Sequence, residues 1–144
     1  MARSITTAFN NAIKSQVVRP FLACELAFST GILYFWNGYG DITMTAGGSS
    51  NTFTCLGDWI NVSTISESDK VAAIGASLSL TGIKSSLISA ALSANYTNRN
   101  ASIYLGLFDT SKSVIADVYT LFKGKMDIMK IDEGAETATI TLNV

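Results

Sequence analysis

The sequence of 144 residues contains no histidine. This absence removes the commonest general base of enzymes and the commonest protein ligand of transition metals. It also excludes catalytic sites in which a histidine activates a serine or cysteine nucleophile. We therefore expect no enzymatic activity, no catalytic residues and no metal site.

Cysteine is scarce, since Cys24 and Cys55 are the only two. Two cysteines are too few for a disulfide framework or a four-thiolate metal site. Both lie in apolar, strand-like surroundings, which favours buried free thiols. We predict no cofactor and no cofactor-binding residues.

Charge is also scarce. Charged residues make up 15% of the chain and hydrophobic residues 48%, with ten basic and eleven acidic side chains giving a net charge of −1. Ordinary soluble domains have about 25% charged residues, and protein interfaces are depleted in charge. This composition predicts a surface that contacts other proteins. The absence of a basic stripe argues against a specific nucleic-acid ligand.

Long apolar runs are missing. No run reaches the roughly 18 residues of a membrane span. The first twenty residues carry Asn10, Asn11, Lys14 and Gln16 at positions where a signal peptide would be apolar. We expect neither membrane insertion nor export.

The N-terminal residues have helical spacing. Ser4 is a suitable N-cap, and Pro20 is expected to end the helix. Two interpretations remain open, a helix packed on its own domain and an arm that docks on a neighbouring subunit. The chain is accordingly divided into a helical arm, residues 1–19, and a β-rich domain, residues 20–144. The candidate subunit-interface residues on the apolar face of the arm are Ile5, Phe9, Ile13 and Val17.

After Pro20, apolar residues recur at every second position. Leu22–Phe28 and Ile32–Trp36 predict a β-hairpin, and the glycines of Ala46–Asn51 indicate a flexible connector. Further along, Ile74, Ala76, Leu78 and Leu80 alternate with small or polar residues, as in a strand with one face in a core. Gly82 is expected to end this strand, and helical spacing predicts a short helix from Ile83 to Ala94.

The last third of the chain repeats short apolar segments between polar turns. It predicts strands at Ala101–Phe108, Val114–Leu121 and Phe122–Ile131, the last pairing with Glu136–Val144 around an acidic hairpin tip. The resulting fold class is mainly β. It is a β-sandwich or partly open β-barrel of about eight or more short strands, with the N-terminal helix and a short helix after the central strand.

Two groups of side chains are candidates for chemistry. Trp36, Tyr39 and Trp59 fit three roles: core residues, interface anchors, or a stacking platform for sugars or bases. The carboxylates nearest apolar strands are Glu25, Asp109 and Asp127. Paired carboxylates cleave glycosidic bonds or hold hard cations, but the spacing here forms no local motif, which favours solvated turn and strand-edge residues.

The ordered set of segments resembles the β-rich tail-tip proteins, baseplate hub or distal tail, of long-tailed bacteriophages and gene-transfer particles. The resemblance spans nearly the whole chain and depends on order and spacing, because each segment is short. The segments are the helix ending in Val18-Arg-Pro20, the hairpin Leu22–Phe28 and Ile32–Trp36 with Asn37-Gly-Tyr-Gly-Asp41, Gly57-Asp-Trp-Ile-Asn-Val-Ser63, Gly75–Gly82, Ile103–Asp109 and Phe122–Asp127.

This resemblance implies a structural subunit of the tail tip. Such subunits form threefold or sixfold rings with copies of themselves and with other phage tail proteins, around a channel through which the tape-measure protein and the genome DNA pass non-specifically. It implies location in the virion after synthesis in the cytoplasm of the bacterial host. Some hub proteins bind an iron–sulfur cluster through several cysteines, but two distant cysteines do not support a cluster here.

The sequence thus favours a structural virion protein that assembles into a ring through strand edges and the helical arm. The alternative is a carbohydrate-binding β-sandwich that contacts the host surface through Trp36, Tyr39 and Trp59. Clustering of these rings on one exposed face would favour the alternative, whereas separate burial would favour the structural role.

Overall fold

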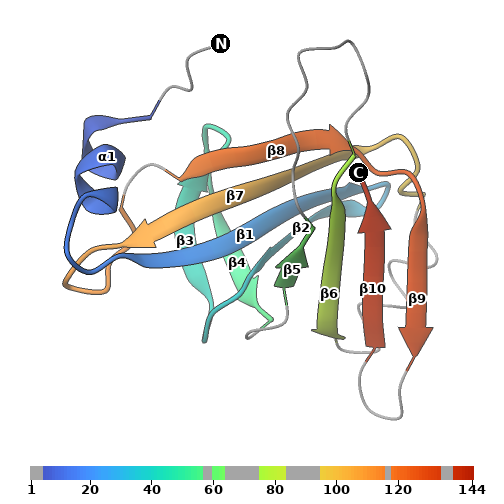
Figure 1. Ribbon diagram of the computed structural model, residues 1–144. Coiled ribbons are helices and arrows are strands. Elements are labelled where there is room, and N and C mark those ends of the chain that lie inside the picture. Colours follow the sequence, from blue (N-terminus) through green and yellow to red (C-terminus); the bar gives the residue numbers. More distant parts are fainter. Residues whose placement is uncertain (1–4, 57–59, 64–74, 84–94, 116–117, 134–137) are drawn as a thin grey trace.

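A six-stranded sheet is the largest element of the computed structural model, which describes residues 5–56, 60–63, 75–83, 95–115, 118–133 and 138–144 (Figure 1). Its strands follow the order β3-β4-β2-β1-β7-β8. Neighbours are antiparallel except β2 and β4, which pair in parallel over two residues. The strands are β1 (Arg19–Phe28), β2 (Gly31–Trp36), β3 (Ile42–Ala46), β4 (Ser49–Cys55), β7 (Asn100–Phe108) and β8 (Tyr119–Lys125).

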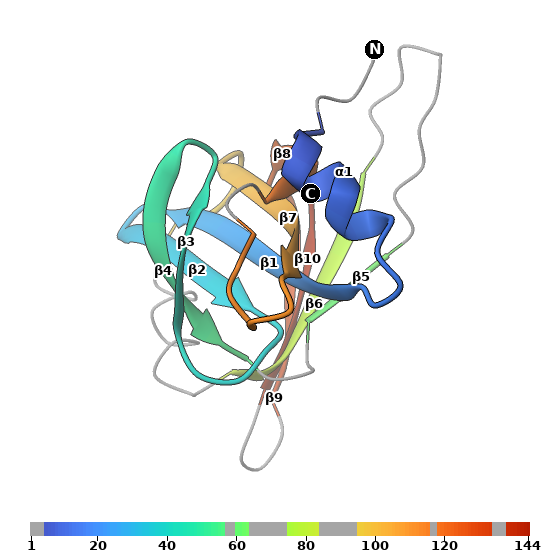
Figure 2. The same cartoon turned by 90° about the vertical axis from the view of Figure 1, so that its left-hand side faces the viewer.

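A second sheet of four antiparallel strands packs against the first. Its order is β5-β6-β10-β9, with β5 (Ile60–Val62), β6 (Ser77–Ile83), β9 (Met129–Glu133) and β10 (Ala138–Asn143). The larger sheet curls into a half-barrel, and the smaller sheet covers its convex side (Figures 1 and 2). The helix α1 (Thr7–Ile13) lies at one end of the half-barrel.

The apolar residues form two clusters, one on each face of the larger sheet. Alternating side chains of β1 point to opposite faces, so the strand contributes to both clusters. The inter-sheet cluster fills the space between the sheets and consists of Cys24, Leu26, Phe28, Phe35, Leu56, Ile60, Leu78, Leu80, Ala101, Ile103, Met126, Ile140 and Leu142. The curl cluster lies on the concave face and consists of Phe21, Ala23, Trp36, Met44, Ala46, Phe53 and Tyr104.

Several sequence predictions are confirmed. The fold is mainly β, and β1 and β2 form the predicted antiparallel hairpin. Ala76, Leu78 and Leu80 are buried on one face, as their alternation indicates. Both cysteines are free thiols, although Cys55 is only half-buried.

The N-terminal helix is shorter than predicted. Thr6 is the N-cap, because its Oγ1 accepts a hydrogen bond from the Phe9 N–H at 3.3 Å, and the helix ends at Ile13. The Ser15 hydroxyl donates to the Ala12 carbonyl and competes with continuation of the helix. Pro20 is therefore not the helix stop but the second residue of β1. It fits there because β2 pairs with β1 only from Ala23 onward, so no second strand needs a donor at Pro20.

Two glycine positions were interpreted wrongly. Ala46–Asn51 is not a flexible connector, because Gly47 and Gly48 form a two-residue hairpin turn between β3 and β4 with φ of 61° and 89°. Gly82 does not end β6. The pairing of β6 with β10 shifts by one residue there, so the strand continues through a β-bulge to Ile83.

The boundary between the last strands also differs from the prediction. Phe122 and Lys125 belong to β8 in the larger sheet, whereas β9 begins at Met129 in the smaller one. The corner between them is held by backbone hydrogen bonds: Met126 N–H to Arg99 O, Asp127 N–H to Asn143 O and Asn143 N–H to Ile128 O, at 2.7, 2.9 and 2.9 Å. No glycine, proline or asparagine marks the corner.

The predicted helix from Ile83 to Ala94 does not begin at Ile83, which is the last residue of β6, and its remaining residues lie outside the described part of the chain. The predictions for Ile74 and Trp59 also fall outside the described residues. Within the described part of the chain, no helix is long and apolar enough to cross a membrane.

Candidate interaction sites

Only part of the predicted apolar face of the arm is buried in the structure. Phe9 is buried and its ring lies 6.0 Å from that of Tyr119 in β8, which anchors α1 on its own domain. Ile5, Ile13 and Val17 remain exposed. Phe9 is the one buried residue of the seven-residue helix. Docking of Ile5, Ile13 and Val17 on another subunit stays a prediction.

The predicted aromatic group does not form an exposed platform. Trp36 is buried against Phe21 and Phe108, with ring centroids 5.8 and 5.9 Å away, and its indole N–H donates to the Gly40 carbonyl at 2.8 Å. Tyr39, in contrast, is 97% exposed. Trp59 lies outside the described residues. Trp36 and Tyr39 thus present no pair of open ring faces on which a sugar would stack.

Trp36 and Tyr39 do line one cavity, which we call the end pocket. It has a volume of about 470 Å³ and lies where β1 and β3 begin and β7 ends. Its lining residues are Arg19, Trp36, Tyr39, Ile42, Phe108 and Lys112.

The cations of the end pocket are held by the loop that follows β7. The Arg19 guanidinium donates to the carbonyls of Asp109 and Thr110 at 3.0 and 3.3 Å. The Asp109 carboxylate accepts from the N–H groups of Ser111 and Ser113, which fixes the turn that carries Lys112 at a φ of 63°. The lining contains two cations and no carboxylate. The pocket is therefore suited to an apolar group that carries a negative charge.

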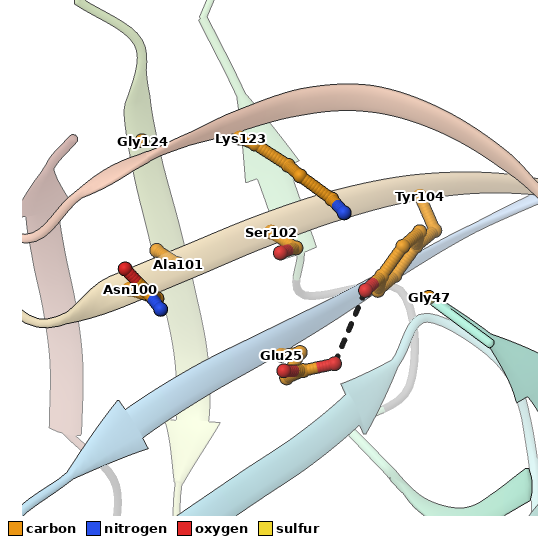
Figure 3. A pocket seen from close by; sticks show the side chains of 8 residues that line it. All are labelled: Glu25, Gly47, Asn100, Ala101, Ser102, Tyr104, Lys123 and Gly124. Carbon is orange, nitrogen blue, oxygen red and sulfur yellow. Dashed lines mark hydrogen bonds between the residues drawn. The ribbon is translucent and has the colours of Figure 1, made fainter. Parts of the chain in front are cut away.

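A second cavity, of about 260 Å³, lies on the concave face at the opposite end of the curl cluster (Figure 3). The strand register places Tyr34, Glu25, Ser102 and Lys123 in one row across β2, β1, β7 and β8. Figure 3 shows the Tyr104 hydroxyl pointing at Glu25, to whose Oε2 it donates a hydrogen bond of 3.1 Å. The cavity is lined by Glu25, Gly47, Asn100, Ala101, Ser102, Tyr104, Lys123 and Gly124.

The electrostatics of this row favour a neutral phenol. Burial raises the pKa of Tyr104 to about 12, the nearby Glu25 carboxylate adds to the rise, and a hydrogen bond with Ser102 opposes it. Burial and the Glu25 charge also raise the pKa of Tyr34. At neutral pH both phenols are donors and not bases. The described residues contain no group of three His, Cys, Asp or Glu side chains that could hold a metal ion.

The three carboxylates singled out in the sequence are not brought together. Glu25 lies inside the half-barrel, Asp109 supports the turn after β7, and Asp127 is exposed at the corner between β8 and β9. Sequence reasoning missed the pairing of Glu25 with Tyr104 and the joint placement of Arg19 and Lys112. The one available signal was the charge of Glu25 inside an apolar strand, which indicates a partner for the carboxylate.

No family model and no curated protein matches the chain. Among solved structures, the fold is similar to that of a chain in the virion of a native gene transfer agent particle, with a TM-score of 0.62 and 15% sequence identity. The match covers 96% of this chain but only 44% of that chain. At this identity the likeness shows a shared fold.

Proposed function

We propose that this chain is a structural protein of a phage-like virion. The observation that carries the proposal is the fold, which is shared over 96% of the chain with a virion protein of a gene transfer agent particle. The low content of charge adds support, because surfaces that other proteins cover are depleted in charged residues. The proposal includes no enzymatic activity.

The finer proposal is a ring at the tail tip, in a hub or distal-tail position, formed by three or six copies. Its partners are the copies themselves and other tail proteins, with the tape-measure protein and DNA passing through the channel. The ring is supported by exposed apolar side chains at the end of the molecule that carries α1 and the start of β1. Ile5, Ile13, Val17 and Val18 are all exposed there, whereas most other large apolar side chains that the structure describes are buried or half-buried.

The test is the assembly state of the purified full chain, measured by native mass spectrometry over a range of concentrations and by electron microscopy of negatively stained samples. We expect closed particles of three or six copies, because heterologous contacts that close produce rings. A chain that stays monomeric at the highest concentration would contradict ring formation.

A matched pair of variants tests the role of the arm. Ile13→Ser removes an apolar side chain that is 45% exposed on α1, and Ile32→Ser removes one that is 47% exposed on β2. We expect Ile13→Ser to weaken association by about tenfold, as for an apolar interface residue worth about 1.4 kcal/mol, and Ile32→Ser to have little effect. An Ile13→Ser variant that associates as tightly as the wild-type chain would remove the arm from the interface.

A further inference from the structure

The end pocket and the corner between β8 and β9 lie at opposite ends of the half-barrel. Arg19 pairs with Phe108 at one end of the β1–β7 ladder, and both residues line the pocket. The corner lies at the other end, where Met126 donates to Arg99 immediately before β7 begins. From the first to the last of the nine residues of β7 there are eight steps of about 3.3 Å, so the two ends are about 26 Å apart. Figure 1 shows the start of β1 on the left and the corner on the right.

The corner presents a carboxylate beside an exposed apolar side chain. Asp127 is exposed and Ile128 is 61% exposed. We call these two residues the tip. Among the large exposed apolar residues of the described chain, Ile128 is the one whose neighbour in sequence is an acidic residue. The others are Ile5, Ile13, Val17, Val18, Ile32 and Tyr39.

The tip is held rigidly although its side chains face solvent. The Asp127 N–H and the Ile128 carbonyl both bond to the backbone of Asn143 at 2.9 Å, and the preceding Met126 is buried. A rigid segment loses little conformational entropy when it binds, which favours its use as a contact.

We propose that the tip of one copy inserts into the end pocket of the next copy. The Ile128 side chain would contact the aromatic floor formed by Trp36 and Phe108, and the Asp127 carboxylate would pair with Lys112 and Arg19. The complementarity of charge supports this occupant, because the pocket lining has two cations and no carboxylate. The inference deepens the proposed ring, on which it rests, by naming the two surfaces that meet.

The placement of the pocket and the tip at opposite ends explains why copies would join one after another. The pocket and the tip are too far apart for one chain to fill its own pocket. A contact between opposite ends leaves a free pocket at one side and a free tip at the other. Such a contact repeats head to tail, and it closes into a ring when the rotation between copies permits.

Charge reversal tests this contact. The variants are Lys112→Asp, which keeps a residue that tolerates a positive φ, and Asp127→Lys. Both positions are exposed, and circular dichroism checks that the variants fold. We expect each variant alone to raise the dissociation constant between copies by about tenfold or more, because a charge pair becomes a repulsive one. The double variant restores the pair between positions 112 and 127 in swapped form and should assemble more tightly than either single variant, with the unchanged Arg19 keeping the recovery incomplete.

Mixing the two single variants gives the sharpest outcome. A 1:1 mixture offers two complementary junctions, the unaltered charge pair and the swapped pair, so native mass spectra should show assemblies that contain equal numbers of the two variants, whereas each variant alone stays dissociated. The matched controls are Lys130→Asp and Asp132→Lys. These residues form an exposed ion pair of 3.3 Å on β9, and reversing either one should leave assembly unchanged.

The outcomes separate this inference from the proposed function. If the wild-type chain assembles and the two single variants assemble equally well, the tip contact is wrong and the proposed ring stands. If the wild-type chain stays monomeric, both fail. If the pocket instead binds polygalacturonate, and Lys112→Asp abolishes that binding without affecting assembly, the occupant is an acidic glycan and the inference is overturned.

Discussion

The two faces of the six-stranded sheet bury apolar residues in different ways. The inter-sheet cluster is built mainly from aliphatic side chains and is covered by a complete second sheet. The curl cluster is mainly aromatic and has a cavity at each end, one beside Glu25 and one beside Arg19. Ser102, a buried polar residue, also lines the concave face. The comparison suggests that the convex face supplies stability, whereas the concave face and its ends carry the polar groups available for contacts.

The largest effect is expected from a cavity in the inter-sheet cluster. Leu78 is fully buried, and Leu78→Ala should lower the free energy of unfolding by about 3–5 kcal/mol, because the two sheets cannot close the gap. Met44→Ala in the curl cluster should cost about 2 kcal/mol, since the open half-barrel relaxes more easily. Urea unfolding measures both, and equal losses would break the comparison.

A smaller effect is expected from overpacking the curl cluster. A Cβ atom at Gly106 would fall within the ring of Phe21, which packs against Trp36 and Phe108. Gly106→Ala should therefore cost about 1–3 kcal/mol and disturb the aromatic contacts. The near-ultraviolet circular dichroism of the aromatic residues reports the disturbance. Unchanged stability and spectrum would mean that the cluster is loosely packed.

The smallest effect at neutral pH concerns the Tyr104–Glu25 bond. Tyr104→Phe should cost about 1 kcal/mol, because the half-buried Glu25 loses one donor but keeps access to water. Chemical denaturation at pH 7 measures the loss. A loss of stability above 3 kcal/mol would show that the polar row beside Tyr104 is as inaccessible to water as the inter-sheet cluster.

Tyr104→Phe should also reduce the fall in the free energy of unfolding that the wild-type chain shows at alkaline pH. The pKa of Tyr104 is raised from 10.0 to about 12, so the unfolded chain releases this proton first and stability falls as the pH rises through 10 toward 12. The Cys24 thiol, whose pKa burial raises from 9.0 to about 12, contributes a fall that begins near pH 9. Tyr104→Phe should remove the first contribution and Cys24→Ala the second. Parallel profiles for wild type and Tyr104→Phe would contradict this assignment.

Local patterns predicted the elements better than their boundaries. The hairpin of β1 and β2 and the buried face of β6 follow from alternation, which is a property of neighbouring residues. The shift at Gly82 and the corner at Met126 do not, because both depend on hydrogen bonds to strands far away in sequence. The early end of α1 likewise reflects the Ser15 hydrogen bond and the anchoring of Phe9 on Tyr119.

The candidate sites were less predictable than the fold. The sequence singled out Trp36 and Tyr39 together, but their exposures are opposite, and the indole of Trp36 is fixed by its hydrogen bond to the Gly40 carbonyl. The end pocket joins Arg19, Ile42 and Lys112, residues that no short motif connects. The tip was visible in the sequence only as one of three carboxylates near apolar strands.

By itself, the sequence determined a histidine-free, charge-poor, mainly β chain, because composition and period are local quantities that residues carry wherever they lie. Only the tertiary structure decided which face each strand shows to which cluster, where the polar row and the end pocket form, and that the pocket and the tip lie at opposite ends. Those features depend on strand order and register, which are set by the packing of distant segments against one another.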